Sequence, residues 1–165
     1  MKLVRQIFSL SLALSLVSLT AAFLGKLGWV PILIGLSIGV QWAFMVWNGR
    51  RTLSFSFLGL LALLVYGAAI YLPAGWLLGS LVMLLVAWDL SEFSAQLVRF
   101  GPDRVDPKLV HNHILRLFYV AGSGFVLGGL ALVIKLRLGF GIAVLLGLLV
   151  FVGLAGAVRF LRRSL

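Results

Sequence analysis

The sequence contains no cysteine and only four acidic residues, and both shortages limit what the protein can be. Without cysteine the chain forms no disulfide, no zinc site with thiolate ligands and no thiol redox centre. Charged residues make up 11% of the chain, whereas a soluble domain carries about 25%. With 62% hydrophobic residues and a mean hydropathy of +1.18, the chain has too few charges to cover a water-facing surface. We therefore expect an integral membrane protein that is solvated by the lipid bilayer.

The excess of basic over acidic residues gives a net charge of +10, which in a soluble protein would suggest a nucleic-acid partner. Here the basic residues stand at the ends of apolar segments, which is the pattern that orients membrane helices. The sequence shows no surface that combines basic and aromatic residues to bind nucleic acid. We therefore expect no nucleic-acid partner, and we expect residues 1–165 to form a single polytopic membrane domain.

Long apolar segments separated by turn signals predict an all-α integral membrane protein with six transmembrane helices. A hydrocarbon core of roughly 30 Å is crossed by about 20 helical residues. No run alternates apolar and polar residues, so we expect no strands. The one long connection is the cytoplasmic loop 98–111 between the fourth and fifth spans. The expected spans lie near residues 5–24, 28–48, 53–72, 75–97, 112–134 and 138–160.

The first apolar segment has two interpretations. Its basic start, apolar middle and Thr20-Ala21-Ala22 sequence are typical of a cleavable secretory signal. As a retained span, the segment would place Ser11, Ser15 and Ser18 on one helical face, which suits packing against another helix. We favour the retained span, and whether the segment is ever cleaved stays open.

The distribution of basic residues predicts that the N- and C-termini both face the cytoplasm. In a six-span topology, eleven basic residues lie on the side of the termini and three on the opposite side, as the positive-inside rule requires. We therefore expect a multi-pass protein integral to the cell membrane, either an inner or a plasma membrane. The eleven are Lys2, Arg5, Arg50, Arg51, Arg99, Arg104, Lys108, Arg116, Arg159, Arg162 and Arg163, and the three are Lys26, Lys135 and Arg137.

The spacing of basic residues and glycines suggests an internal repeat. Arg5, Arg51 and Arg116 each stand at the cytoplasmic start of an odd-numbered span, and a glycine opens the next span 23, 24 and 23 residues later. This regularity is consistent with three αα-hairpins inserted in the same direction. Any antiparallel hairpin needs a basic anchor, a span and a turn glycine, so ordinary anchoring also explains it.

Glycine pairs spaced four residues apart indicate where helices approach each other closely. Gly35 and Gly39 form one pair in the second span, and Gly124 and Gly128 form another in the fifth. Between lipid-solvated helices, close van der Waals contact replaces the hydrophobic drive that acts in water. We expect helix packing at these four glycines, either within one chain or between copies.

All four acidic residues and both histidines lie within residues 88–116, so this stretch is the main candidate for chemistry. Asp89 stands 13 residues after Trp76, which marks the outer boundary, and this spacing corresponds to about 20 Å of helix. It therefore lies short of the cytoplasmic surface, and an acid at such depth is a functional hypothesis by default. The structural interpretation is an ion pair, in which Arg116 at a similar height neutralises Asp89.

A catalytic interpretation of the same stretch uses Asp89, Glu92, His111 and His113 at the cytoplasmic boundary. Carboxylates and imidazoles are the usual groups for general acid–base work. Two histidines separated by one residue point about 200° apart on a helix, whereas metal-binding helical pairs are spaced three or four residues apart. We therefore expect no metal site, and we expect no cofactor because the sequence carries no cofactor-binding motif.

Three classes of function fit these observations. The first, which we favour, is a non-catalytic scaffold or accessory component that binds other membrane subunits or further copies of itself. The second is a small transporter or substrate-capture module, whose polar candidates are Gln41, Tyr66, Ser11 and Ser15. The third is a membrane-embedded enzyme that uses Asp89, Glu92 and His111.

Overall fold

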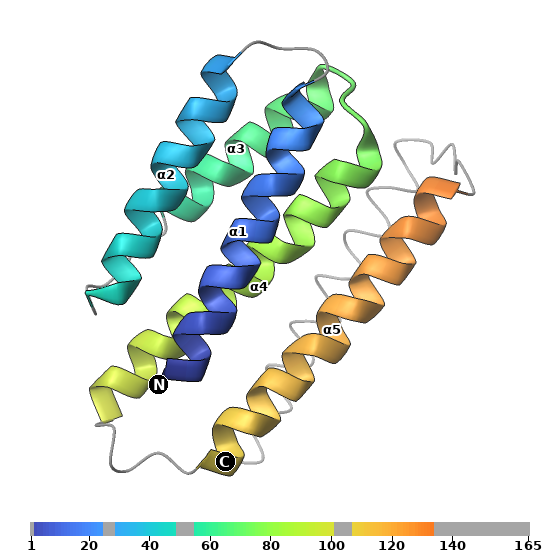
Figure 1. The fold of residues 1–165 in the computed structure, drawn as a ribbon. Helices are drawn as coiled ribbons and strands as arrows, with labels where there is room; N and C mark the ends of the chain where they lie inside the picture. Colours follow the sequence, from blue (N-terminus) through green and yellow to red (C-terminus); the bar gives the residue numbers. More distant parts are fainter. Residues whose placement is uncertain (1, 25–28, 49–54, 101–106, 134–165) are drawn as a thin grey trace. The chain divides into compact units, whose positions relative to one another are not determined.

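The structure, a computed structural model, describes residues 2–24, 29–48, 55–100 and 107–133. The regular structure of these residues is helical and includes no strand, which confirms the expected all-α class (Figure 1). The helices belong to one compact unit that ends at Val133. The sixth expected span, 138–160, lies outside the described residues. The helices are α1 (Lys2–Leu24), α2 (Trp29–Trp47), α3 (Phe55–Ala69), α4 (Ala74–Phe100) and α5 (Pro107–Val133).

Four of the described helices are long and apolar enough to cross a membrane, which supports the expectation of a membrane protein. The helix α3 has 15 described residues and is not among the four. The expected third span, 53–72, begins in a part of the chain outside the description. The four candidate spans are Leu3–Leu24, Trp29–Trp47, Ala74–Val98 and Lys108–Val133.

The C-terminus of α3 lies earlier than the sequence predicts because the chain turns directly after Ala69. The N–H of Tyr71 donates to the carbonyl of Ala68 at 3.1 Å, and the N–H of Leu72 donates to the carbonyl of Gly67 at 3.0 Å. These two bonds form the Schellman arrangement that ends many helices. Tyr71 occupies its left-handed position with a φ of 58°, where glycine is usual. Because a tyrosine and not a glycine stands at this position, the sequence did not indicate that the helix ends here.

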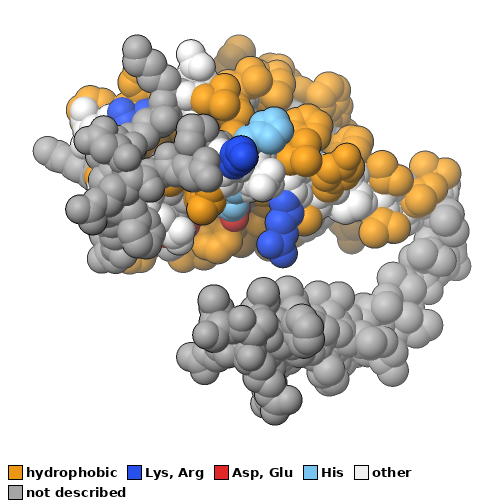
Figure 2. All heavy atoms as spheres, turned by 90° about the horizontal axis from the view of Figure 1, so that it is seen from below, with side chains coloured by type: hydrophobic (Ala, Val, Ile, Leu, Met, Phe, Trp, Pro, Cys, Tyr) orange, Lys and Arg blue, Asp and Glu red, His pale blue; other side chains and the backbone are white. Residues whose placement is uncertain are grey.

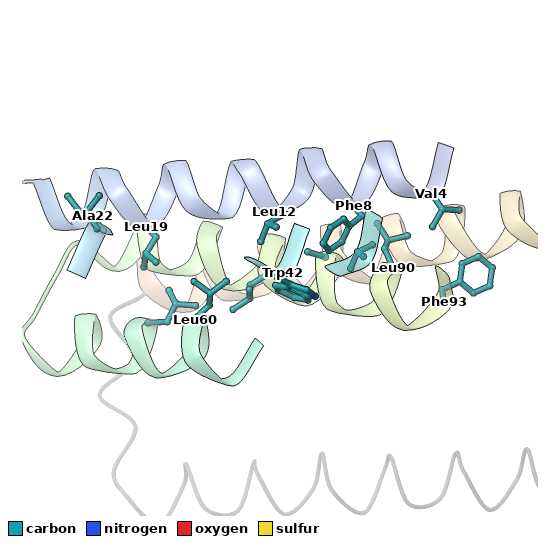
Figure 3. Close-up of a cluster of buried hydrophobic side chains, with 14 of the residues drawn as sticks. Val4, Phe8, Leu12, Leu19, Ala22, Trp42, Leu60, Leu90 and Phe93 are labelled. Carbon is teal, nitrogen blue, oxygen red and sulfur yellow. The ribbon is translucent and has the colours of Figure 1, made fainter. Parts of the chain in front are cut away.

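The helix α1 supplies one side of the main apolar core. It packs on α4 more extensively than on any other helix, and it also contacts α2 and α3 (Figure 1). Its buried side chains recur at helical spacing and point toward the neighbouring helices (Figure 3). The ring of Phe8 meets that of Trp42 on α2 edge-on, with centroids 5.6 Å apart and planes at 72°. The labelled buried residues of α1 are Val4, Phe8, Leu12, Leu19 and Ala22.

The expected glycine pair of the second span lies on the buried face of α2. A Cβ atom at Gly39 would come within 2.6 Å of a methyl carbon of Leu16 on α1. A Cβ atom at Gly35 would lie 3.5 Å from Leu19 on α1 and 3.5 Å from Leu63 on α3. The absence of a side chain at Gly39 thus lets α1 and α2 approach closely.

A pair of buried serines joins α1 to α4. The hydroxyl of Ser15 donates to the carbonyl of Ser80, and the hydroxyl of Ser80 donates to the carbonyl of Ser15, each at 3.0 Å. The two Oγ atoms lie 3.1 Å apart. Hydroxyls that bond across helices satisfy polar groups that lipid cannot hydrate. Ser15 therefore links two helices and does not face an open channel.

Within the described chain, α5 contacts only α4. A Cβ atom at Gly128 would come within 2.8 Å of Leu78 on α4, whereas one at Gly124 would meet nothing within 4 Å. Of the expected glycine pair in the fifth span, Gly128 therefore packs against α4, whereas Gly124 does not contact it. Helix α4 extends to Phe100 and α5 begins at Pro107, so helical residues occupy both ends of the segment 98–111.

Candidate functional site

The structure brings Asp89 of α4 and His113 of α5 into direct contact. The Nε2 atom of His113 lies 2.7 Å from Oδ2 of Asp89, which is a short, charge-assisted distance when the carboxylate is ionised. An ionised carboxylate only accepts, so the imidazole Nε2–H donates in this bond. The side chain of Asp89 is 42% exposed and that of His113 is 30% exposed, so the pair lies at the edge of the helix contact.

Phe93 fixes the plane of the imidazole. The ring of Phe93 stacks on that of His113 with centroids 4.0 Å apart and planes inclined by 13°. Asp89 and Phe93 are four residues apart, so both lie on the face of α4 that meets α5. Phe93 is buried. Its ring covers one face of the imidazole, and the carboxylate of Asp89 bonds the edge of the imidazole.

Arg116, which the sequence suggested as the partner of Asp89, is exposed on α5. Among the described residues, the ion pair of Asp89 is formed with His113. His113 is three residues nearer the start of α5, and it lies at the contact with α4. His113 is thus the partner of Asp89 that the sequence analysis expected Arg116 to be.

The four candidates for a catalytic or metal-binding cluster do not gather in the described structure. Glu92 and His111 are both exposed, whereas Asp89 and His113 face each other across α4 and α5. No group of three potential metal-binding side chains occurs among the described residues. The separation of His111 from His113 follows the roughly 200° between alternate positions of a helix.

The pair can act chemically through the imidazole of His113, which Asp89 holds in one orientation. A carboxylate that holds one ring nitrogen leaves the other nitrogen free to exchange a proton. Nucleophilic catalysis would also require a nucleophile, such as a hydroxyl, within reach of the ring. The hydroxyls of Ser91 and Ser94 on α4 donate to carbonyls of their own helix, those of Trp88 and Ser91, both at 2.8 Å. The described geometry is thus a contact between two helices that holds an oriented imidazole.

The candidates for substrate binding lie in four separate environments. Ser15 is bonded to Ser80, and Ser11 is buried on α1. Tyr66 is partly exposed and stacks on Phe23, with ring centroids 6.5 Å apart. Gln41 is exposed on α2. The described structure therefore does not bring these four residues to one binding site.

The surface near the candidate site mixes polar and apolar groups. Figure 2 shows Lys or Arg and His side chains beside one another, with a small acidic surface next to them, among predominantly hydrophobic side chains. Large apolar residues are also exposed along α5. A surface of this kind suits the boundary between lipid tails and headgroups.

Two features of the structure were not singled out in the sequence. Ser80 was not recognised as the partner of Ser15, because one serine in an apolar helix is a weak signal. Gly122 and Gly129 on α5 are the second feature, since a Cβ atom at either position would meet no described neighbour within 4 Å. Their spacing of seven residues, with Phe125 between them, is a signal that could have indicated a packing face.

A comparison of the chain with known protein families, characterised proteins and solved structures finds no match. The assignment of function therefore depends on the geometry of the chain itself.

Proposed function

We propose that the chain is a multi-pass protein of the cell membrane, with six spans and both termini in the cytoplasm, that serves as a non-catalytic component of a membrane complex. Four helices with the length and composition of spans support the membrane setting. The division of basic residues, eleven against three, supports the orientation. The polar contacts between helices support a structural role, because Ser15–Ser80 and Asp89–His113 both join one helix to another.

The observation that carries this proposal is a face of α5 composed of Phe118, Gly122, Phe125 and Gly129, which we call the glycine–phenylalanine face. These residues recur at i, i+4, i+7 and i+11 and therefore share one side of the helix. Both phenylalanines are exposed, and a Cβ atom at either glycine would meet no atom of the described residues within 4 Å. Small residues beside large ones allow a further helix to approach closely in a membrane. We propose a helix of a partner subunit as the occupant.

The proposal is tested by crosslinking in native membranes. A photoreactive residue at position 122 should capture another membrane protein, which mass spectrometry of the product identifies after purification in mild detergent. The control is a photoreactive residue at position 65 on α3, where Val65 is also exposed. Equal capture at both positions, or a product confined to the chain itself, contradicts the proposal.

A second candidate function is proton transfer, which the short contact between Asp89 and His113 favours. Acidic residues and histidines within membrane helices commonly relay protons. Liposomes containing the purified chain and a trapped pH dye would report proton flux under an imposed gradient. A flux that is lost in both Asp89→Asn and His113→Ala, but kept in His111→Ala, establishes proton transfer. The same flux in all four proteins, or none in the wild type, excludes it.

A further inference from the structure

The outward side of α5 carries a row of polar residues that neither proposed function uses. Asn112, Arg116, Tyr119 and Ser123 recur at i, i+4, i+7 and i+11, so they share one face of the helix. All four are exposed. Val110, His113, Leu117 and Gly128, which pack toward α4 or the core, lie on another side. The polar row is also separate from the glycine–phenylalanine face.

The same face of α5 changes character along its length. Beyond Ser123 it continues with the exposed apolar residues Val126, Leu130 and Val133. In the orientation proposed above, Val133 lies near the outer boundary. Arg116 precedes it by 17 residues, or about 26 Å at 1.5 Å per residue, which is close to the thickness of the hydrocarbon core. Arg116 therefore lies near the cytoplasmic headgroups, with Asn112 farther out and Tyr119 slightly deeper.

The side chains of this row are suited to a phosphate group. A guanidinium group binds phosphate oxygens through two parallel N–H donors. The amide of Asn112 and the hydroxyl of Tyr119 provide further donors on the same face. The row contains no acidic residue, and Asp89 is held by His113 at the contact with α4.

We propose that this face of α5 binds an anionic phospholipid of the cytoplasmic leaflet. Arg116, Asn112 and Tyr119 hold the phosphate, and an acyl chain lies along Val126, Leu130 and Val133. A lipid fits better than a further helix because the polar donors and the apolar residues follow one another in the order of a headgroup and its tail. The proposal rests on the membrane orientation of the proposed function, but it does not require a protein partner.

The test uses the full-length chain purified in detergent and titrated with phosphatidylglycerol or phosphatidylcholine, with bound lipids counted by native mass spectrometry. Phosphatidylglycerol should bind more tightly than phosphatidylcholine to the wild type. The variant Arg116→Gln should weaken phosphatidylglycerol binding about five-fold, which is the usual effect of losing one basic residue at an anionic membrane surface. Tyr119→Phe should weaken it less, and Arg116→Lys should retain most of the preference.

The matched control is Arg5→Gln, which removes the same charge at the cytoplasmic end of α1. The proposal expects Arg5→Gln to bind lipid like the wild type. It is overturned if both arginine variants lose binding equally, because lipid would then follow net charge. It is also overturned if Arg116→Gln keeps the preference, or if Arg116→Gln instead dissociates a dimer of the chain. Failure to find a protein partner by crosslinking would leave these lipid results unaffected, so the two proposals fail separately.

Discussion

At the scale of single residues, the contact between Asp89 and His113 gives the carboxylate of α4 a partner on α5. The imidazole donates to the carboxylate, and the ring of Phe93 covers the face of the imidazole. Because both side chains are partly exposed, water competes with the bond between them. The contact therefore contributes modestly to stability and mainly sets how α4 and α5 meet.

The first prediction concerns this contact. His113→Ala should lower the free energy of unfolding by about 1–2 kcal/mol, because it removes a partly exposed ion pair and a stacked ring. Reversible unfolding of the purified chain in mixed micelles measures the change. His111→Ala is the matched control, since His111 is exposed on the same helix, and it should change stability by less than about 0.5 kcal/mol. Equal losses in the two variants would show that the contact contributes nothing of its own.

The second prediction concerns the close approach of α1 and α2. Gly39→Leu should cost about 1–3 kcal/mol, because its side chain must enter space that Leu16 fills. Gly124→Leu should be nearly neutral, since a Cβ atom there meets nothing within 4 Å in the described part of the chain. The same unfolding measurement compares the two variants. A larger loss for Gly124→Leu would contradict the described packing.

At the scale of helices, the serine pair is the main polar link inside the described bundle. Each hydroxyl donates to the backbone of the opposite helix, so the pair contributes two interhelical bonds. Measured bonds of this kind in membrane proteins contribute about 0.6 kcal/mol on average and up to about 1.7 kcal/mol. The serine pair therefore fixes the position of α1 along α4 and also stabilises the contact between the two helices.

The third prediction follows from the two separate bonds. The double variant Ser15→Ala with Ser80→Ala should lose about 1–2 kcal/mol, which is close to the sum of the two single losses. The control Ser91→Ala is also buried on α4 but bonds within its own helix, to the carbonyl of Trp88, so it should lose less. Thermal unfolding in detergent measures all four variants. A double variant as stable as Ser91→Ala would show that the serines do not join the helices.

The helices themselves could be predicted from the sequence, but their rotations could not. Apolar length and turn signals located the ends of the five described helices within about five residues. The largest difference is at the start of α5, and α3 ends three residues early, where Tyr71 takes the place of a glycine. The partner of Asp89 depends on how α5 is turned about its axis. That rotation is set by contacts such as Gly128 against Leu78. A single sequence does not report such contacts, which is why Arg116 was expected where His113 lies.

At the scale of the whole molecule, every functional proposal depends on how the chain crosses the membrane. The glycine–phenylalanine face must lie within the bilayer for a partner helix to reach it. The polar row of α5 must lie at the cytoplasmic boundary for a headgroup to reach Arg116. Both conditions follow from a topology with six spans and both termini in the cytoplasm, which is the central claim.

Because the chain has no cysteine, single cysteines can be introduced and labelled without background. The most direct measurement is labelling of intact cells with a membrane-impermeant maleimide in three variants, Asn48→Cys, Ala74→Cys and Ser164→Cys. The proposed topology predicts that Ala74→Cys reacts in intact cells, whereas Asn48→Cys and Ser164→Cys react only after lysis. Reaction of Ser164→Cys from outside would contradict a sixth crossing, and reaction of Asn48→Cys from outside would contradict the orientation.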